Sequence, residues 1–302
     1  MANNNNNKQW LYILLLFSFI FLFYKGIKSI LNKATTNSTS TNEGFTQDAP
    51  FVLKQDDAID DDFYIPFYRE MTKKNELYKK EITDILTSTQ ASPELSVILV
   101  VGSTTGNEIE YLHDDKGYTE IMGVHHNNRV VGAQGKGDAQ DQQQQLMMCA
   151  DVCADPMLFD RKTFTHILCL GTSLQHMKDD DAFFKNARQW LCLGGYLAIR
   201  CVTNPKEFLL PTTTNHSKTE FMDFSYKVDI EPTATATATD KTLAVLMKET
   251  FINQQGQVRE NERTFILEPP TQLVEKVALR GFTPKGEFKY KNGTVVYLFQ
   301  RI

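Results

Sequence analysis

The sequence predicts an α/β protein with a mostly parallel sheet and an antiparallel hairpin at its C-terminal end. Between residues 97 and 202, short apolar runs typical of buried strands alternate with segments of helical periodicity. The first run ends in a glycine turn that opens a helix, and an Asn-Gly pair near the C-terminus separates two strand-like segments. Alternation at this spacing predicts helices on both faces of a parallel sheet.

Composition limits the function classes. The chain has 302 residues, which is enough for one large globular domain with extensions or at most two small domains, and its net charge is −5. No nucleic-acid partner is expected, because nucleic-acid-binding proteins usually carry a basic face. The cysteines lie in or beside apolar segments without a repeated C-x-x-C spacing, which indicates reduced core residues rather than a disulfide or zinc framework. They are Cys149, Cys153, Cys169, Cys192 and Cys201.

The N-terminal region differs from the rest. Residues 1–9 form an Asn-rich cap that we expect to be disordered, and residues 32–55 form a flexible tether rich in polar residues. Within residues 10–31, the apolar run Trp10–Tyr24 is uncharged, and counted to Ile27 it has about the minimum length for a membrane-spanning helix, because the Lys25 side chain can reach the interface. A cleaved signal peptide is the alternative. We favour an uncleaved transmembrane anchor, since the run is not followed by the small residues of a cleavage site.

Lysines flank the apolar run unequally. Lys25, Lys28 and Lys33 follow it, whereas only Lys8 precedes it. By the positive-inside rule, this asymmetry places the rest of the chain in the cytosol. We therefore expect a single-pass membrane protein whose globular domain, residues 56–302, faces the cytosol.

The domain opens with helical structure and a buried strand. From residue 63 to residue 86, apolar side chains recur at mixed spacings of three and four, which predicts helical structure. Val97–Val101 then predicts a buried strand, and Gly102 and Gly106 predict a tight turn into a helix. Such a turn is either a ligand site beneath a helix N-terminus or an ordinary core turn, and the stretch alone leaves both open.

The parallel part of the sheet continues through four more predicted strands: Glu120–Val124, Leu146–Ala150, Phe164–Leu170 and Tyr196–Val202. A second helix is expected to begin at Asn127, and residues 132–145 form a polar, glutamine-rich insertion that we expect to be mobile. Asp179–Leu193 has one apolar face and is predicted to be a helix capped by Gly194 and Gly195.

The C-terminal part has a different order. It predicts a strand, a helix and an antiparallel hairpin: Val258–Leu267, Pro270–Arg280 and Gly286–Arg301. The hairpin is expected to turn at Asn292-Gly293. The alternating run Thr233–Thr239 fits either a strand or a low-complexity loop, and we expect a loop.

Taken together, the element order and several short motifs resemble the class I S-adenosylmethionine-dependent methyltransferases. The resemblance covers about residues 63 to 301, and its motifs are Ile98–Gly106, Gly123-Val124, Ala150-Asp151-Val152, Phe164–Ile167, Trp190–Leu197 and Leu279–Phe282. The phrase Leu-x-x-Gly-Gly-aromatic-Leu within Trp190–Leu197 is moderately specific, and the glycine turn is weakly so. The resemblance implies a Rossmann-like fold and S-adenosyl-L-methionine as cofactor.

The resemblance also implies cofactor-binding residues. In the family, a glycine loop passes under the methionine end of the cofactor, an acidic residue at the end of the second strand takes the ribose hydroxyls, and another after the third strand meets the adenine amine. Residues at the end of the fourth strand lie beside the methionine moiety, and aromatic residues of the helix before the first strand close over the cofactor. The corresponding residues here are Gly102, Ser103, Thr104 and Gly106; His125; Asp151 with Val152; Leu170 and Gly171; and Tyr64 and Tyr68.

Three positions depart from the family pattern. Relatives usually have an acidic residue where Val100 stands, a glycine in place of Thr104, and an acidic residue in place of His125. A carboxylate accepts from both ribose hydroxyls, whereas a neutral imidazole accepts one hydrogen bond and donates another. Two lost charge-assisted bonds, at about 1.5–3 kcal/mol each, would weaken cofactor binding by several orders of magnitude. Loss of the cofactor is therefore left open.

No residue stands out as a catalytic base. His176 follows the fourth strand, where acceptor-facing residues often lie in the family, and it is the one candidate, although a single His in a loop is more often structural. No metal site is expected: the adjacent His125 and His126 should point in different directions and have no third ligand at a recognisable spacing.

Two functions of different classes remain. The first is a membrane-anchored S-adenosylmethionine-dependent methyltransferase acting on a small-molecule, lipid or protein acceptor. The second is a catalytically inactive methyltransferase-fold domain that serves as a membrane-tethered binding or scaffold module. A nicotinamide-dependent oxidoreductase is disfavoured, because the loop lacks G-x-G-x-x-G. We favour the enzyme, because Asp151 and the glycine turn are retained.

Overall fold

The described part of the chain is the globular domain. A computed structural model describes residues 51–302 except 56–57, 59–60, 75, 104, 127–130, 132–145, 178, 204–223, 234–242 and 292. The predicted cap, the predicted anchor and the insertion at 132–145 lie outside the described residues. Among the residues that are described, no helix combines the length and apolar character that a membrane crossing requires.

The larger of two sheets has seven strands in the order β10-β11-β6-β5-β2-β3-β4. The strands are β2 (Ile98–Val101), β3 (Ile121–His125), β4 (Met147–Cys149), β5 (Phe164–Cys169), β6 (Leu191–Val202), β10 (Phe282–Tyr290) and β11 (Thr294–Arg301). Neighbours from β4 to β6 pair in parallel, and β11 runs antiparallel to β6 and β10. The predicted mostly parallel sheet with a C-terminal antiparallel hairpin is confirmed.

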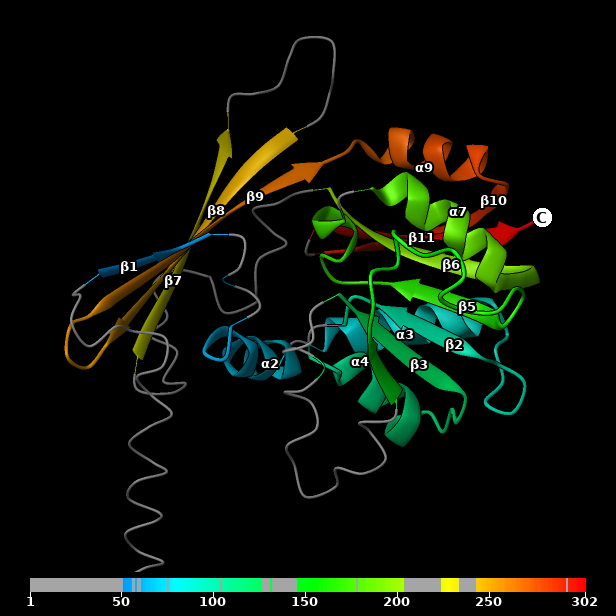
Figure 1. Cartoon of the computed structure of the whole chain (residues 1–302), viewed down its shortest axis with the longest axis horizontal. Coiled ribbons are helices and arrows are strands. Elements are labelled where there is room, and N and C mark those ends of the chain that lie inside the picture. Colours follow the sequence, from blue (N-terminus) through cyan, green and yellow to red (C-terminus); the bar gives the residue numbers. More distant parts are fainter. Residues whose placement is uncertain are drawn as a thin grey trace, which may run out of the picture.

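Helices cover both faces of this sheet (Figure 1). They are α3 (Leu77–Ser88) and α4 (Asn107–Glu110) on one face, and α7 (Asp180–Trp190) and α9 (Pro270–Leu279) on the other. Because strand side chains alternate, Ile98 and Val100 of β2 pack into the core under α3 and α4, whereas Leu99 and Val101 pack under α7 and α9. The central strand is therefore buried on both sides, as its uninterrupted aliphatic sequence predicts.

The helical structure predicted from residue 63 to residue 86 is confirmed, but it is divided into two helices. α2 (Tyr64–Lys74) ends before α3 begins at Leu77. Apolar residues of α2, such as Phe67, pack against a second sheet, whereas those of α3 pack against the large sheet. The periodicity of three and four is the same on both helices, and it does not reveal that their partners differ.

The predicted end of the helix over 179–193 was wrong. α7 ends at Trp190, and Leu191 already pairs with Phe164 of β5. The register then shifts, so that Tyr196 pairs with His166. Gly194 and Gly195 lie within β6 at this irregularity rather than at a helix cap. A Cβ at Gly195 would lie 3.0 Å from two backbone carbonyl oxygens, which explains the need for glycine there.

The second sheet has four strands in the order β1-β9-β8-β7. They are β1 (Phe51–Lys54), β7 (Phe224–Thr233), β8 (Leu243–Asn253) and β9 (Val258–Leu267). Only β9 was predicted; β1 lies in the stretch assigned to the flexible tether, and Thr233, assigned to a loop, ends β7. The rest of the threonine run lies outside the described residues. On β8 and β9 the inward positions include the charged residues Glu249, Arg259 and Arg263, which hide the apolar alternation of a strand.

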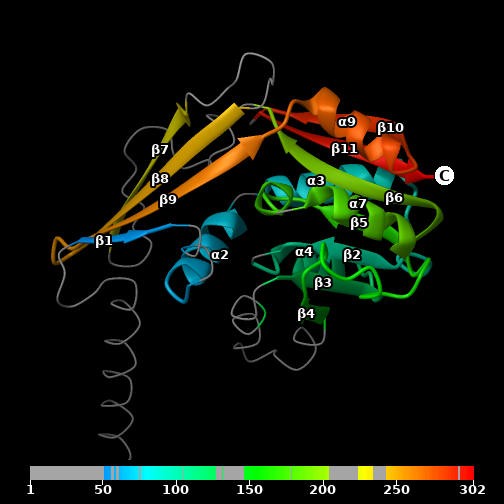
Figure 2. The same cartoon turned by 45° about the horizontal axis from the view of Figure 1, so that its top comes forward.

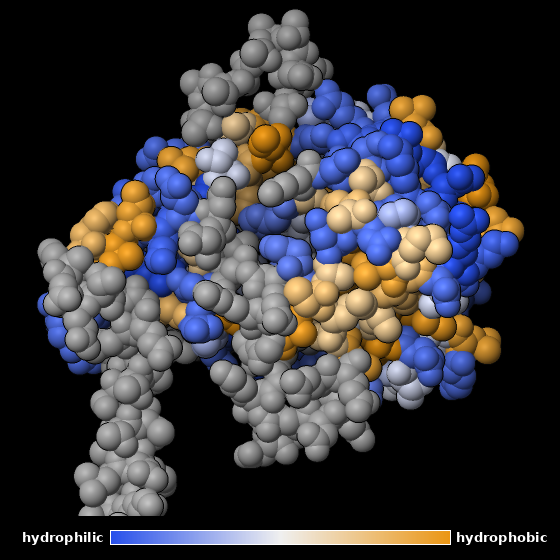
Figure 3. Space-filling model, viewed as in Figure 1, coloured by the Kyte–Doolittle hydropathy of each residue, from blue (hydrophilic) through white to orange (hydrophobic). Residues whose placement is uncertain are grey.

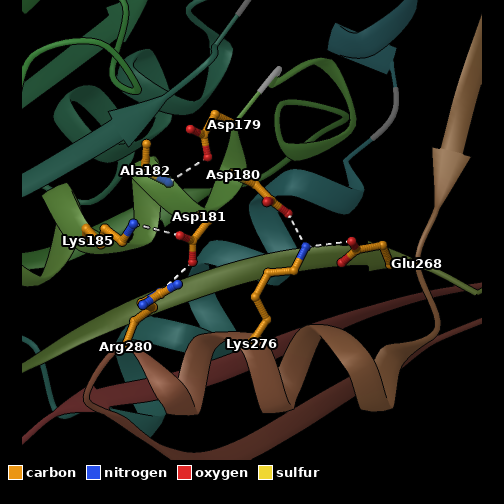
Figure 4. A network of polar contacts seen from close by, with 8 residues as sticks. All are labelled: Asp179, Asp180, Asp181, Ala182, Lys185, Glu268, Lys276 and Arg280. Carbon is orange, nitrogen blue, oxygen red and sulfur yellow. Dashed lines mark hydrogen bonds and ion pairs between the residues drawn. The ribbon is translucent and has the colours of Figure 1, made fainter.

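Figures 1 and 2 show the small sheet beside the large one, with α2 between them. The exposed apolar residues Phe51, Leu53 and Ile252 belong to the small sheet, and an apolar patch lies over its outer end in Figure 3. Where β9 leads into α9, charged residues connect the small sheet to α7 (Figure 4). Lys276 Nζ contacts Asp180 at 2.8 Å and Glu268 at 2.5 Å, so one lysine links α9, the end of β9 and the start of α7.

Candidate functional site

A cavity of about 650 Å³ lies between the two sheets, at the carboxyl ends of β2 to β5. Its volume is within the range of small-molecule sites, and this edge is where open α/β sheets bind ligands. Two walls enclose it. The glycine-loop wall is formed by residues after β2 to β5: Gly102, His125, Asp151, Val152, Leu170 and Gly171. The small-sheet wall is formed by Tyr64, Tyr68, Tyr226, Met247, Glu249, Arg263 and Phe265.

Most residues predicted from the sequence line this cavity. Those present are Tyr64, Tyr68, Gly102, His125, Asp151, Val152, Leu170, Gly171 and the candidate base His176. Ser103 and Gly106 belong to the same loop but do not line the cavity, and Thr104 lies outside the described residues. The role of these residues in cofactor binding stays a prediction.

The glycine loop is held closed by its own side chains. Ser103 Oγ accepts a hydrogen bond from the backbone N–H of Gly106 (3.1 Å) and donates to Glu108 Oε2 (2.6 Å). Gly106 has a φ of +73° at the N-terminus of α4. Ser103 therefore fixes the turn and holds the Glu108 carboxylate, which lines the cavity. Sequence analysis missed Glu108.

Two glycines of this wall have positive φ for different reasons. Gly102 has a φ of +72°, and a Cβ there would lie 2.3 Å from Ser173 Oγ, so the loops after β2 and β5 are packed in direct contact. Gly171 has a φ of +69°, and the nearest atom to a Cβ would be 4.0 Å away. The backbone at Gly171 is thus open to a close approach by a ligand, whereas Gly102 is required by packing.

The position at the end of β3, where relatives usually carry an acidic residue, is occupied by His125. This imidazole is buried at 4% exposure and stacks on His126, with ring centroids 4.5 Å apart and an interplanar angle of 27°. The expectation that the two rings point in different directions was wrong, because β3 ends at His125 and His126 lies in a bend. Alternation along a strand therefore does not apply to this pair.

Asp151 follows β4 and keeps an exposed carboxylate at the cavity. Its Oδ1 accepts a hydrogen bond from the backbone N–H of Cys153 (2.9 Å), which fixes the start of the turn. Asn186 of α7 donates to the Val152 carbonyl (2.9 Å) and holds this segment against the large sheet. A carboxylate can accept further hydrogen bonds, so Asp151 remains able to bind a ligand N–H.

The small-sheet wall contains a buried polar network that sequence analysis missed. Glu249 is 1% exposed; its Oε1 accepts hydrogen bonds from Tyr64 and Tyr226, both at 2.8 Å. Arg263 Nη2 donates to Glu249 Oε2 at 3.1 Å and to the Tyr64 hydroxyl at 2.9 Å. Glu249 and Tyr64 are separated by 185 residues, so no local motif could identify the pair. Charged residues at alternating positions of β8 and β9 were the available signal.

Burial determines the protonation states in this network. It raises the pKa of both Tyr64 and Tyr226 well above its usual range, so both phenols stay protonated and donate to Glu249. Burial alone would lower the pKa of Arg263, but Tyr64 and Glu249 raise it overall, so the guanidinium stays charged. The network is therefore one buried ion pair with two tyrosine donors.

A second buried ion pair lies at the same cavity. Arg200 of β6 lines it and donates from Nε to Glu81 Oε1 of α3 at 2.8 Å, while Nη2 contacts Glu81 Oε2. Glu81 is fully buried, so the two charges neutralise each other within the core. We interpret this pair as structural, because the bidentate geometry uses both Glu81 oxygens.

The candidate base lies between the two walls. His176 ends a short 3₁₀ turn, η4 (Leu174–His176), that follows β5. Its ring meets the ring of Phe265 edge-on, with centroids 5.3 Å apart. His176 is thus positioned by the small sheet, which its sequence context did not indicate.

Comparisons with known proteins agree with this geometry. Residues 99–199 match a family model described as a methyltransferase domain. A comparison with curated protein sequences found no match. Three solved structures with similar folds are an amino pentose methyltransferase from Micromonospora echinaspora with SAM bound, an S-adenosylmethionine-dependent methyltransferase from Clostridium acetobutylicum, and DesVI from Streptomyces venezuelae.

Their similarity lies in the fold rather than in the sequence. The Micromonospora protein is 14% identical, with 74% of this chain and 92% of that chain covered and a TM-score of 0.54. The Clostridium protein is 12% identical, with 74% and 90% covered and a TM-score of 0.53. DesVI is 15% identical, with 79% and 97% covered and a TM-score of 0.53. The family-model match over residues 99–199 and these structures together show that the chain has the fold of the class I S-adenosylmethionine-dependent methyltransferases.

Proposed function

We propose that the chain is an S-adenosyl-L-methionine-dependent methyltransferase that binds this cofactor in the cavity between the two sheets. The observation that carries the proposal is the convergence of four strand ends on one cavity, where Gly102, His125, Asp151 and Gly171 meet. One solved structure of similar fold, the Micromonospora methyltransferase, is described as SAM bound.

The residues of the glycine-loop wall fit such a cofactor, with one weak position. Gly171 leaves its backbone open to the methionine end, and the Asp151 carboxylate can accept from the adenine amine beside the apolar Val152. Tyr64 and Tyr68, whose rings stack 5.7 Å apart, can cover the ligand. His125 can accept only one of the two hydrogen bonds that a ribose diol offers, so it is the weak position.

When bound, S-adenosyl-L-methionine supplies an electrophilic methyl group on its sulfonium. The chain's own residues bind the two reactants, hold them in line and exclude water. His176 lies between the two walls, where it can take the proton that an acceptor nucleophile loses. We assign it that role as a proposal.

Calorimetry of the full-length chain in mild detergent tests cofactor binding. We expect micromolar affinity for S-adenosyl-L-methionine and S-adenosylhomocysteine, tightened roughly tenfold or more in His125→Asp, because a carboxylate restores a charge-assisted hydrogen bond. Asp151→Asn should weaken binding. It serves as the matched loss-of-contact variant, since Asp151 is exposed and its replacement leaves the core intact.

A second candidate function is a catalytically inactive scaffold domain, and His125 is the observation that favours it. The same titration separates the two functions. If only His125→Asp binds the cofactor, the site has lost its ligand and the inactive domain is correct. If the unaltered chain binds, the enzyme is supported and a search for acceptors is justified.

We propose further that residues 10–31 anchor the chain in a membrane, with the domain in the cytosol. The uncharged run and the lysines that follow it support this topology. The exposed apolar side chains of Phe51 and Leu53 lie at the start of the domain, where a membrane surface would be near. Resistance to carbonate extraction, lost on deletion of residues 1–31, is the expected result. Extraction of the intact chain would exclude the anchor.

A further inference from the structure

We propose that Arg263 selects the methyl acceptor, and that this acceptor is a neutral molecule with a hydrogen-bond-accepting oxygen next to a ring or similar apolar body. The inference rests on the proposed methyl transfer and names the acceptor chemistry of the same cavity.

Arg263 has hydrogen-bond donors that the described residues do not use. A guanidinium carries five N–H groups. Its hydrogen bonds in the described part of the chain, to Tyr64, Glu249 and the Met247 sulfur, all run through Nη2. The Arg263 side chain is only 7% exposed and lines the cavity. Its Nε is buried and has no hydrogen-bond partner among the described residues. Nη1 takes part in none of these hydrogen bonds, so an acceptor oxygen in the cavity can pair with the guanidinium there.

The charges around the cavity favour a neutral oxygen over an anion. Glu249 already neutralises Arg263, and Arg200 is neutralised by Glu81. The cavity is also lined by the carboxylates of Glu108, Asp151 and Asp179. A carboxylate or phosphate on the acceptor would therefore enter a site of net negative charge and lose its hydration as well. A carbonyl or hydroxyl oxygen accepts the same hydrogen bond without that repulsion.

The surroundings of the guanidinium favour an apolar body next to this oxygen. Arg263 Cζ lies 5.3 Å from the Tyr64 ring centroid and 5.4 Å from that of Phe265, so it sits between two aromatic side chains. Met247 and Phe265 line the cavity beside it, and His176 contacts Phe265. A ring can pack on these side chains while its oxygen reaches the guanidinium.

Matched small molecules test the inference on the full-length chain. All four molecules have a benzene ring and differ in its substituent. Benzamide and benzyl alcohol carry a substituent with a neutral oxygen, benzoate carries an anionic carboxylate, and ethylbenzene carries no oxygen. Binding is measured by saturation-transfer NMR with and without saturating S-adenosylhomocysteine. We expect benzamide and benzyl alcohol to bind at least tenfold more tightly than benzoate and ethylbenzene. Preferential binding of benzoate, or equal binding of all four molecules, would overturn the inference.

Two variants assign the effect to Arg263. Arg263→Lys keeps the charge but loses the planar fork, and it should weaken benzamide binding about tenfold. Arg259→Lys is the matched control, because Arg259 is on the same strand, is 1% exposed and pairs with Asp61, but does not line the cavity. Unchanged benzamide affinity in Arg263→Lys would contradict the proposal. If that variant does not fold, the double variant Arg263→Gln with Glu249→Gln removes both charges and should lose the same preference.

The outcome separates this inference from the proposed function. Binding of S-adenosylhomocysteine without any dependence of benzamide on Arg263 rejects the acceptor inference alone. Failure of the unaltered chain to bind S-adenosylhomocysteine, with its binding restored in His125→Asp, rejects the proposed function instead.

Discussion

The two walls of the cavity are built by different means. The glycine-loop wall consists of residues that directly follow parallel strands, held by backbone conformation and short-range hydrogen bonds such as that from Gly106 N–H to Ser103 Oγ. The small-sheet wall depends on a buried ion pair and tyrosine hydroxyls contributed by residues up to 199 positions apart. The first wall follows from local sequence. The second exists only when α2, β8 and β9 are packed together.

The difference extends into the cores. Beside β2 the core is aliphatic and aromatic, whereas the inward face of β8 and β9 includes Glu249, Arg259, Asn261 and Arg263. A polar core of this kind is stable only while every partner is present. We therefore expect single substitutions to be more damaging in the small sheet than in the loops of the large one.

The largest effect is expected from breaking the ion pair of the small-sheet wall. Arg263→Met leaves Glu249 charged and buried without its cation, which should lower the free energy of unfolding by about 3–5 kcal/mol. Urea denaturation followed by Trp190 fluorescence measures this. The double variant Arg263→Met with Glu249→Gln should recover most of the loss. If Arg263→Met is as stable as the unaltered chain, the small-sheet wall does not depend on its buried ion pair.

Lowering the pH should destabilise the large sheet, because folding disfavours protonation of His166. Its imidazole is 5% exposed and hydrogen-bonds Thr165 (2.9 Å) and Thr89 (3.0 Å), and burial lowers its pKa to about 4. The unfolded chain, with a pKa near 6.5, binds the proton first, so stability falls as the pH falls from about 6.5 to 4. The loss should reach about 3 kcal/mol at pH 4.

Variants of two histidines test this assignment. His166→Gln should remove this part of the pH dependence, measured as the urea midpoint at several pH values. His113→Gln is the control, because the His113 side chain is 41% exposed. An unchanged pH profile in His166→Gln would rule His166 out as the titrating group.

A substitution at a glycine of the glycine-loop wall is expected to have a smaller effect on stability, and this effect acts through backbone conformation. Gly102→Ala forces an L-residue into a positive φ, at about 1–2 kcal/mol, and also brings its Cβ against Ser173. Gly117→Ala is the matched control, since Gly117 has a φ of +73° but no atom within 4 Å of a Cβ. We expect Gly102→Ala to lower the thermal midpoint further than Gly117→Ala. Equal losses would mean that the contact between the loops after β2 and β5 adds nothing.

The smallest effect on stability is expected from the Lys276 ion pairs, which link α9 with the end of β9 and the start of α7. Lys276→Met removes contacts to Asp180 and Glu268, but Lys276 is 28% exposed, so the cost should be at most about 1 kcal/mol and should shrink in high salt. Lys285→Met, at an exposed position of β10, is the control. A loss of stability as large as that of Arg263→Met would show that the Lys276 ion pairs stabilise the small sheet as much as the buried Arg263–Glu249 pair does.

The sequence by itself determined the parallel sheet and the positions of its loops. Val97–Val101 and Gly102 act through backbone conformation and burial, which depend on neighbouring residues. Because parallel strands end at one edge, Gly102, His125, Asp151 and Gly171 had to meet there once the strand order was set. The prediction that His125 is the weak position rests on the family resemblance and on its side-chain chemistry, and it stays a prediction.

Only the tertiary structure decided the second sheet, the break between α2 and α3, and the small-sheet wall. The inward charges of β8 and β9 obscure a strand pattern until their partners are known. Glu249 is compatible with burial because Tyr64, Tyr226 and Arg263 surround it. A buried charge is stable only through such contacts, and contacts between residues far apart in the chain are set by packing rather than by local pattern.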